Sequence, residues 1–406
     1  MLLFLLLLLA HRNTLTSITA LLFLFCCALY VPAGMTYGKI NNSFIVALLQ
    51  TTTDEAAEFT GMIPVYHFLV SAAIQVFMVI FWRTHRRGHR NWLALLLFVL
   101  CSVNSWPLRM VKGTVVGTTD TLREMQRYKQ LNQHGADNWK ILPGVPLYDT
   151  IVIVTGESVR RDYMSVYGYP VPTTPWLNTA PGLFIDGYTS AAASTVPSLS
   201  RTLIYDYEQN PDSGNNVVAL AAKAGYSTWW ISNQGKLGEH DTRISVIASD
   251  AEHTVFLKKG SFASRKTDDM LLLQETERAL ADKSSPKVIF LHMMGSHPNP
   301  CDRLHSWPNH YLEQYPRKVA CYLASISKLD NFLGQLDGIL RRHSRHFAML
   351  YFSDHGLSVS DSANPVHHDG HVQGGYSVPL IITASDITSQ DRKSTRLNSS
   401  HNCISR

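Results

Sequence analysis

Carboxylate and imidazole side chains follow two apolar runs that lie far apart in this chain. Glu157 comes just after the run 150–155 (TIVIVT), and Asp354 and His355 come just after the run 347–352 (FAMLYF). An apolar run that stops at a polar cluster predicts the carboxyl end of a buried strand in an α/β sheet, where ligand sites form. Two such ends supply two carboxylates and one imidazole, which suit one hard or borderline divalent metal ion.

Further histidines follow a third strand end and a late loop. His292 ends the apolar run 287–292, and His297 comes soon after it. The segment 365–371 (PVHHDGH) comes soon after Asp354 and His355 and contains His367 and His368. These side chains could add ligands for a metal or for a phosphate group.

A hydroxyl-rich loop lies between the first two polar clusters. The segment 191–201 (AAASTVPSLSR) brings Thr195 and Ser198 to the predicted start of a helix. The dipole and the free N–H groups of a helix N-terminus favour a bound phosphate. Since a metal lowers the pKa of a coordinated oxygen, a threonine hydroxyl here could become a nucleophile toward such a phosphate group.

Each group has an ordinary structural explanation when it is taken alone. An Asp-His-Gly sequence after a strand is common in turns, and Glu157 could cap a helix. The joint occurrence of such groups at three strand ends, beside a hydroxyl loop, favours a metal-dependent catalytic site.

Strands and helices alternate from about residue 147 onward, which predicts a mostly parallel sheet with helices on both faces. The pattern has no internal repeat. The predicted strands cover 151–154, 227–232, 287–292, 347–352 and 378–382, and the predicted helices 198–203, 217–224, 268–281 and 319–340.

The first part of the chain is apolar enough for a membrane. The runs 15–31, 62–82 and 92–108 are long enough to approach or span a bilayer. Arg and His residues cluster at 83–90, between two of these spans, so this loop is predicted to be cytoplasmic and everything after 108 to lie outside. The net charge of +5 lies largely in this loop and in the last residues, so it indicates no nucleic-acid partner.

The sequence therefore predicts four regions. Residues 1–112 form a transmembrane helical domain, and 113–148 form a connector with an amphipathic helix at 118–132, which either lies on the membrane surface or packs on the catalytic domain. Residues 149–386 form the α/β domain. Residues 387–406 are expected to be an unstructured tail, artefactual in origin, after an apparently truncated C-terminus.

Two cysteines, Cys301 and Cys321, lie in the predicted exported domain. An oxidising compartment would allow them to form a disulfide. The alternative is two separate free thiols.

Five segments in this order resemble the phosphoethanolamine transferases of the alkaline phosphatase/sulfatase superfamily. They are, in order, 155–177 (TGESVRRDYMSVYGYPVPTTPWL), the hydroxyl loop, 292–301 (HMMGSHPNPC), 353–358 (SDHGLS) and 367–370 (HHDG). The resemblance covers roughly residues 40–385. It implies an N-terminal transmembrane domain followed by an alkaline phosphatase/sulfatase-like α/β catalytic domain with a mostly parallel central sheet.

The resemblance implies that Glu157, Asp354, His355 and Thr195 are metal ligands. Thr195 matches the family nucleophile, because Ser198 then matches the Ser of the family pattern T-x-x-S. An alternative alignment on the proline would place Ala192 at the nucleophile position, which would make the protein inactive.

The remaining histidines match family positions with different roles. The resemblance implies that His297 binds a second metal or the phosphate, as does His367 or His368, between which the sequence does not decide. His292 and Ser198 are expected substrate contacts. The implied cofactor is Zn²⁺, one or two ions, with Mn²⁺ or another divalent metal as the alternative.

The implied reaction transfers phosphoethanolamine from phosphatidylethanolamine to a glycolipid or glycan acceptor through a phospho-threonine intermediate. The implied location is the bacterial inner membrane, multi-pass, with the catalytic domain in the periplasm. A competing hypothesis is a sulfatase-like phosphodiesterase, although Leu199 stands where the sulfatase pattern C/S-x-P-x-R requires arginine. The sequence is also compatible with a glycerol-phosphate polymerase and with an inactive truncated pseudoenzyme.

Overall fold

A computed structural model describes two helices near the start of the chain and most of the residues from 138 onward. The described residues are 14–37, 60–61, 63–83, 138–142, 144–205, 214–234, 243–257, 267–297, 299–359, 366–388 and 393–396. The chain divides into two units, Met1–Met125 and Gln126–Arg406. The predicted span 92–108 and the predicted helix 118–132 lie outside the described residues.

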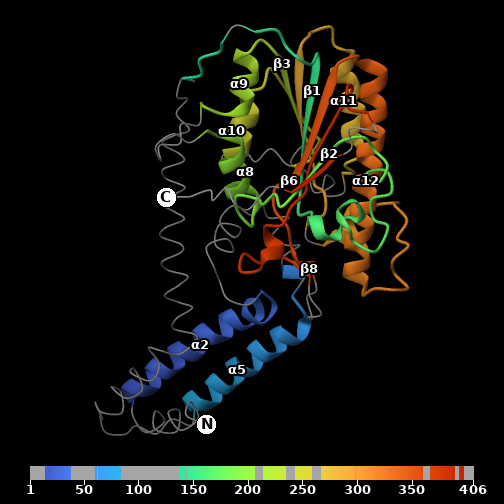
Figure 1. Cartoon of the computed structure of the whole chain (residues 1–406). Helices are drawn as coiled ribbons and strands as arrows, with labels where there is room; N and C mark the ends of the chain where they lie inside the picture. The colour runs from blue at the N-terminus through green and yellow to red at the C-terminus, as the bar shows by residue number, and fades with distance from the viewer. Residues whose placement is uncertain are drawn as a thin grey trace. The chain divides into compact units, whose positions relative to one another are not determined.

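Two apolar helices pack against each other in the first unit (Figure 1). They are α2 (Thr14–Tyr37) and α5 (Val65–Arg83), and each is long and apolar enough to cross a membrane. Polar contacts join them, because Ser71 Oγ donates to the Ala28 carbonyl at 2.6 Å and Thr36 Oγ1 lies 2.8 Å from His67 Nδ1. The predicted run 15–31 is thus helical, as are residues 65–82 of the predicted run 62–82.

The second unit contains a sheet of eight described strands in the order β10-β2-β9-β6-β1-β5-β3-β4. Among these strands, only β9 is antiparallel to its neighbours, and the other strands are parallel to one another. The strands are β1 (Thr150–Gly156), β2 (Leu183–Asp186), β3 (Ser227–Ser232), β4 (His253–Phe256), β5 (Lys287–His292), β6 (Phe347–Ser353), β9 (Leu380–Ala384) and β10 (Lys393–Arg396). The sheet is mixed and mostly parallel, as the sequence predicted.

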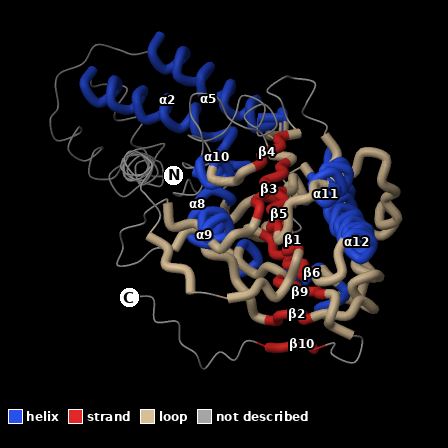
Figure 2. Tube along the Cα trace, turned by 90° about the horizontal axis from the view of Figure 1, so that it is seen from above, coloured by secondary structure: helices blue, strands red, loops and turns tan. Residues whose placement is uncertain are grey.

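Helices cover both faces of this sheet (Figure 2). One face carries α8 (Thr195–Leu203), α9 (Val217–Lys223) and α10 (Arg243–Ser249); the other carries α11 (Leu271–Ala281) and α12 (Arg317–His343). In β1, Val152 and Val154 pack in the cluster that includes α12, whereas Ile151 and Ile153 pack toward the cluster that includes α8. A strand covered on both faces needs an unbroken apolar run, which β1 has.

The register of the central strands determines where the polar ends meet. Gly156 at the end of β1 lies opposite Ser353 at the end of β6, and Thr155 lies opposite His292 at the end of β5. The residues that follow these three strands therefore emerge at one edge of the sheet.

The structure differs from the sequence prediction in the outer strands. β2 and β4 are four-residue strands that the sequence did not predict, because short half-buried strands give little hydrophobic periodicity. Residues 387–406 were expected to be unstructured, but 393–396 form β10, parallel to β2. A strand at the sheet edge is specified by its partner more than by its own sequence.

A disulfide joins the segment before α12 to α12 itself. The sulfur atoms of Cys301 and Cys321 lie 2.12 Å apart, and the Cα atoms 4.8 Å apart. Cys301 lies in the short helix η4 (Pro300–Arg303), so this bond holds the loop that follows β5 against α12.

Asp330 on α12 gives the fold a pH dependence that can be measured. Its buried carboxylate accepts the backbone N–H groups of Trp176 and Leu177 at 2.8 and 2.9 Å. Burial raises the pKa of this carboxyl to about 6, although the two N–H groups act in the opposite direction. The native protein thus binds this proton more tightly than the unfolded chain does.

We therefore predict that Asp330 stabilises the fold more at pH 4 than at pH 7. Relative to Asp330→Asn, the free energy of unfolding of the wild type should rise by up to about 3 kcal/mol as the pH falls over this range. Denaturant unfolding of both detergent-solubilised proteins, followed by tryptophan fluorescence, measures this difference. A difference that stays constant with pH would contradict the assignment.

Candidate active site

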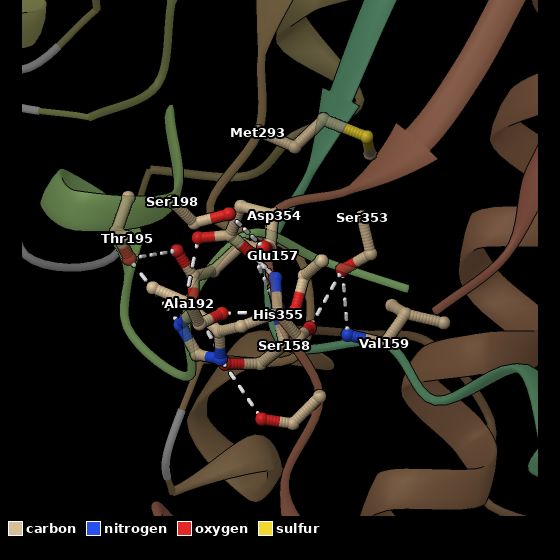
Figure 3. A network of polar contacts seen from close by, with 12 residues as sticks. Glu157, Ser158, Val159, Ala192, Thr195, Ser198, Met293, Ser353, Asp354 and His355 are labelled. Carbon is tan, nitrogen blue, oxygen red and sulfur yellow. Dashed lines mark hydrogen bonds and ion pairs between the residues drawn. The ribbon is translucent and has the colours of Figure 1, made fainter. Parts of the chain in front are cut away.

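Glu157, Asp354 and His355 come together at the carboxyl ends of β1 and β6 (Figure 3). Their side chains are almost completely buried, and one potential ligand atom from each lies within 4.8 Å of the others. His355 Nε2 lies 3.2 Å from Glu157 Oε1 and 3.5 Å from Asp354 Oδ2. The residues that the sequence predicted as metal ligands are thus neighbours in the structure.

Thr195 adds a hydroxyl to this cluster (Figure 3). It is the first residue of α8, after the N-cap Ser194, and its Oγ1 donates to Glu157 Oε2 at 2.9 Å. The same oxygen lies 3.4 Å from His355 Nε2. The competing position, Ala192, carries no group that could act as a nucleophile, so of these two positions only Thr195 brings a hydroxyl to the ligand cluster.

Serine hydroxyl groups bind main-chain groups around Asp354 and His355, at the end of β6. Ser198, one turn after Thr195, donates its Oγ to the Asp354 carbonyl. Ser353 Oγ donates to the His355 carbonyl at 3.0 Å and accepts the Val159 N–H at 2.9 Å. Ser198 stays a predicted substrate contact; in the structure its hydroxyl bond to the Asp354 carbonyl also ties α8 to the Asp354 turn.

Two carboxyl groups buried side by side cannot both ionise without compensation. Burial, together with the nearby Glu157 carboxylate, raises the pKa of Asp354 to about 8. Burial also opposes ionisation of Glu157, but His355, His297 and Ser158 together outweigh it and hold the Glu157 pKa well below the usual range. For His355, burial lowers the pKa, but Asp354 and Glu157 outweigh that effect and raise it to about 9.

This donor set fits a divalent cation. It offers two carboxylates, one imidazole and one hydroxyl, and a cation would replace the proton that the carboxyl pair otherwise retains. Asp354 Oδ2 is buried, and no hydrogen-bond partner reaches it from the described residues. His355 Nδ1 lies 2.8 Å from the Gly356 carbonyl, which orients Nε2 toward the carboxylates.

Ser158 supports both carboxylates, a role that the sequence did not reveal. Its N–H donates to Asp354 Oδ1 at 3.1 Å and its Oγ donates to Glu157 Oε1 at 2.6 Å. Its backbone has a φ of 62°, which is uncommon and strained for serine, and its carbonyl accepts the Tyr322 hydroxyl at 2.9 Å. A sequence shows no sign of such a backbone angle at a residue other than glycine.

Two of the remaining histidines lie near the cluster. The His368 ring centre lies 4.8 Å from that of His355 and 6.1 Å from that of His297. Between the two candidates of the sequence, His368 thus lies beside the site. His367 belongs to the two-residue strand β8 (Val366–His367), which pairs with β7 (Ser358–Val359), and its side chain is not among those described.

His292 lies inside the sheet at the end of β5. Its side chain is buried and its ring packs edge-on against Trp230, with the ring centres 6.0 Å apart. Burial lowers its pKa to about 4, so the ring is neutral at pH 7, despite the opposite effect of Glu157. The role expected from the sequence, contact with substrate, would require access to a ring that is buried in this structure.

The chain is similar to known proteins over most of its length. The Sulfatase family profile matches residues 149–405. The phosphoethanolamine transferase OpgE of Escherichia coli K12 is 33% identical over 388 residues, which cover 88% of this chain and 73% of the relative.

Two solved structures have the same fold as parts of this chain. The integral membrane lipooligosaccharide phosphoethanolamine transferase A of Neisseria meningitidis matches with a TM-score of 0.65 at 18% identity, over 91% of this chain and 77% of that one. The periplasmic domain of EptC from E. coli, solved in complex with Zn, matches with a TM-score of 0.54 at 23% identity, over 62% of this chain and 76% of that one.

The contacts of Ser158 predict a measurable effect on metal affinity. Ser158→Ala removes the hydroxyl that orients Glu157, so the affinity for Zn²⁺ should fall about tenfold to a hundredfold. Competition with a chromogenic chelator measures this. Ser194→Ala is the matched control, because the Ser194 hydroxyl is also buried but makes no hydrogen bond to the described residues. Equal affinities of the two variants would contradict the role of Ser158.

Proposed function

We propose a function from the premise that this chain belongs to the phosphoethanolamine transferase family, whose catalytic domain has the sulfatase fold. The protein transfers phosphoethanolamine from phosphatidylethanolamine to a glycolipid or glycan acceptor of the cell envelope. The transfer passes through a covalent intermediate on Thr195. The observation that carries the proposal is the Thr195 hydroxyl, hydrogen-bonded to Glu157 within a buried ligand cluster.

The proposed cofactor is Zn²⁺, held by Glu157, Asp354, His355 and Thr195. When bound, Zn²⁺ would lower the pKa of the Thr195 hydroxyl and withdraw electrons from the phosphoryl oxygens. Zinc is favoured over Mn²⁺ by the imidazole in the donor set and by the zinc complex of the related EptC domain. A second ion is compatible with His297 and His368, although a phosphate contact by these rings would serve as well.

The position of Thr195 suits the first half of the reaction. Its proton leaves along the hydrogen bond to Glu157 Oε2, and Oγ1 forms a bond to the phosphorus of phosphatidylethanolamine. The bond between phosphorus and the glycerol oxygen breaks, and that oxygen takes up the proton that Thr195 gave up, so that neutral diacylglycerol departs. The N-terminus of α8 presents N–H groups and the positive end of its dipole to the transferred group.

The second half reverses these roles. The oxygen of an acceptor hydroxyl attacks the phosphorus of the phosphoethanolamine–threonine, the Thr195 Oγ1–phosphorus bond breaks, and Thr195 takes up the proton that the acceptor hydroxyl gives up. His368 lies next to His355, and His297 lies next to His368; both rings are proposed to stabilise the charge on the phosphoryl oxygens in both steps. The reaction therefore has ping-pong order.

A lipid donor is consistent with the apolar first unit. The helices α2 and α5 would anchor the enzyme in the bacterial inner membrane, with the catalytic domain in the periplasm. A disulfide between Cys301 and Cys321 suits such an oxidising compartment. The protein is thus proposed to be a multi-pass membrane enzyme whose donor and anchor share one bilayer.

Replacement of the nucleophile tests the proposal. Thr195→Ala should reduce the release of diacylglycerol from fluorescent phosphatidylethanolamine in detergent by about a thousandfold or more. Thr202→Ala is the control, because Thr202 also lies on α8 but donates its hydroxyl to the Ser198 carbonyl. It should remain within about twofold of the wild type. Equal activity of Thr195→Ala and the wild type would exclude Thr195 as the nucleophile.

Removal of the metal gives a second test. Treatment with a chelator should abolish the release of diacylglycerol and lower the melting temperature, since the site binds metal only when folded. Added Zn²⁺ should restore both, and elemental analysis should find about one or two Zn²⁺ per chain. Undiminished activity in protein proved to be metal-free would contradict the proposed cofactor.

A further inference from the structure

The turn after β5 lies directly against the backbone of Glu157. Ser296 donates its N–H to the Glu157 carbonyl at 2.9 Å. Gly295 has a φ of +51°, and a Cβ added to it would lie 2.7 Å from the Glu157 carbonyl oxygen and 2.9 Å from its nitrogen. The turn and the ligand strand therefore fit together with no room for a side chain, and His297 follows at once.

One carboxylate from another part of the chain holds the middle of this turn. Asp269 lies just before α11, and its Oδ1 accepts the Met294 N–H at 2.9 Å while its Oδ2 accepts the Gly295 N–H at 2.8 Å. Each oxygen thus binds one of two consecutive N–H groups, which fixes the direction of the turn as well as its position. Hydrogen bonds to a charged acceptor are stronger than those between neutral groups.

The carboxylate is itself oriented by the end of β3. Asn233 is fully buried, and its Nδ2 donates to Asp269 Oδ1 at 2.7 Å and to the Thr267 carbonyl at 3.0 Å. The Asn233 N–H donates to the His292 carbonyl at 2.8 Å, which joins the same asparagine to the end of β5. Three chain segments meet at Asp269: the end of β3, the start of α11 and the turn that leads to His297.

We propose that Asp269 is a positioning residue for the transfer reaction, which acts by holding the 293–297 turn so that His297 lies beside the metal cluster. The role rests on the proposed function, since it presumes that His297 contacts the transferred phosphoryl group. Asp269 touches neither the ligand atoms nor Thr195 in the interactions above, so it acts through the turn. A displacement of about 1 Å at a reacting group can reduce a rate about a hundredfold.

The neighbour Asp268 provides a matched control. It is also a half-buried aspartate before α11, but its Oδ1 accepts Lys328 Nζ at 2.7 Å and the Met270 N–H at 3.0 Å. Neither of these contacts involves the 293–297 turn. Asp268→Asn and Asp269→Asn therefore remove the same charge at adjacent positions, and only the second weakens the hold on the turn.

The first experiment is hydrogen exchange by mass spectrometry on the full chain in detergent. In Asp269→Asn, amides of 293–297 should exchange about tenfold faster than in the wild type, while those of β5 keep their protection. Asp268→Asn should leave the turn unchanged. If Asp269→Asn does not fold, Asn233→Ala replaces it with the same expected direction. Unchanged exchange of the turn in the folded variant would overturn the proposal.

The second experiment is a double-mutant cycle on the release of diacylglycerol. Asp269→Asn should lower kcat about tenfold to a hundredfold with little change in KM, and its combination with His297→Ala should lose no more than His297→Ala alone. Independent, additive losses would contradict positioning through His297. If the wild type releases no diacylglycerol, the proposed function fails, and the exchange experiment still decides whether Asp269 holds the turn.

Discussion

The burial of two carboxyl groups side by side is the constraint on which the structure of this site depends. Glu157 and Asp354 are neighbours because β1 and β6 pair in parallel, with Gly156 opposite Ser353. Both are buried, where charge is poorly stabilised, and each raises the energy of charge on the other. His355 and Thr195 surround the pair, and a divalent cation would compensate the remaining negative charge.

The elements around the pair are arranged to keep it in place. Ser158 donates one hydrogen bond to each carboxyl group. Its backbone is in the left-handed region, and its carbonyl accepts a hydrogen bond from the Tyr322 hydroxyl. The start of α8 places Thr195 against Glu157, and the 293–297 turn packs on the Glu157 backbone. In the proposed function, this fixed arrangement would activate the Thr195 hydroxyl with little reorganisation of solvent, which favours phosphoryl transfer.

The sequence predicts the central features of this arrangement because they follow from strand ends. The apolar runs before Glu157, Asp354 and His292 are buried on both faces, so their lengths and their polar ends are visible in the chain itself. The start of α8 at Thr195 was close to prediction for a similar reason, since hydroxyl residues mark helix N-termini.

Other features depend on contacts between distant segments and leave no local pattern. The position of His368 beside His355 depends on how the late loop folds back. The positive φ of Ser158 and the hydrogen bonds from the 293–297 turn to Asp269 both depend on tertiary contacts. The strand β10 has an irregular sequence and is specified by its pairing with β2.

The most direct test of this account is anomalous X-ray diffraction at the zinc absorption edge, on crystals of protein that is active as purified. The account predicts a strong zinc peak bounded by Glu157, Asp354 and His355, with Thr195 Oγ1 next to it. Active protein that shows no metal peak between these side chains would contradict the central claim, because the buried carboxyl pair would then be stable and functional without a cation.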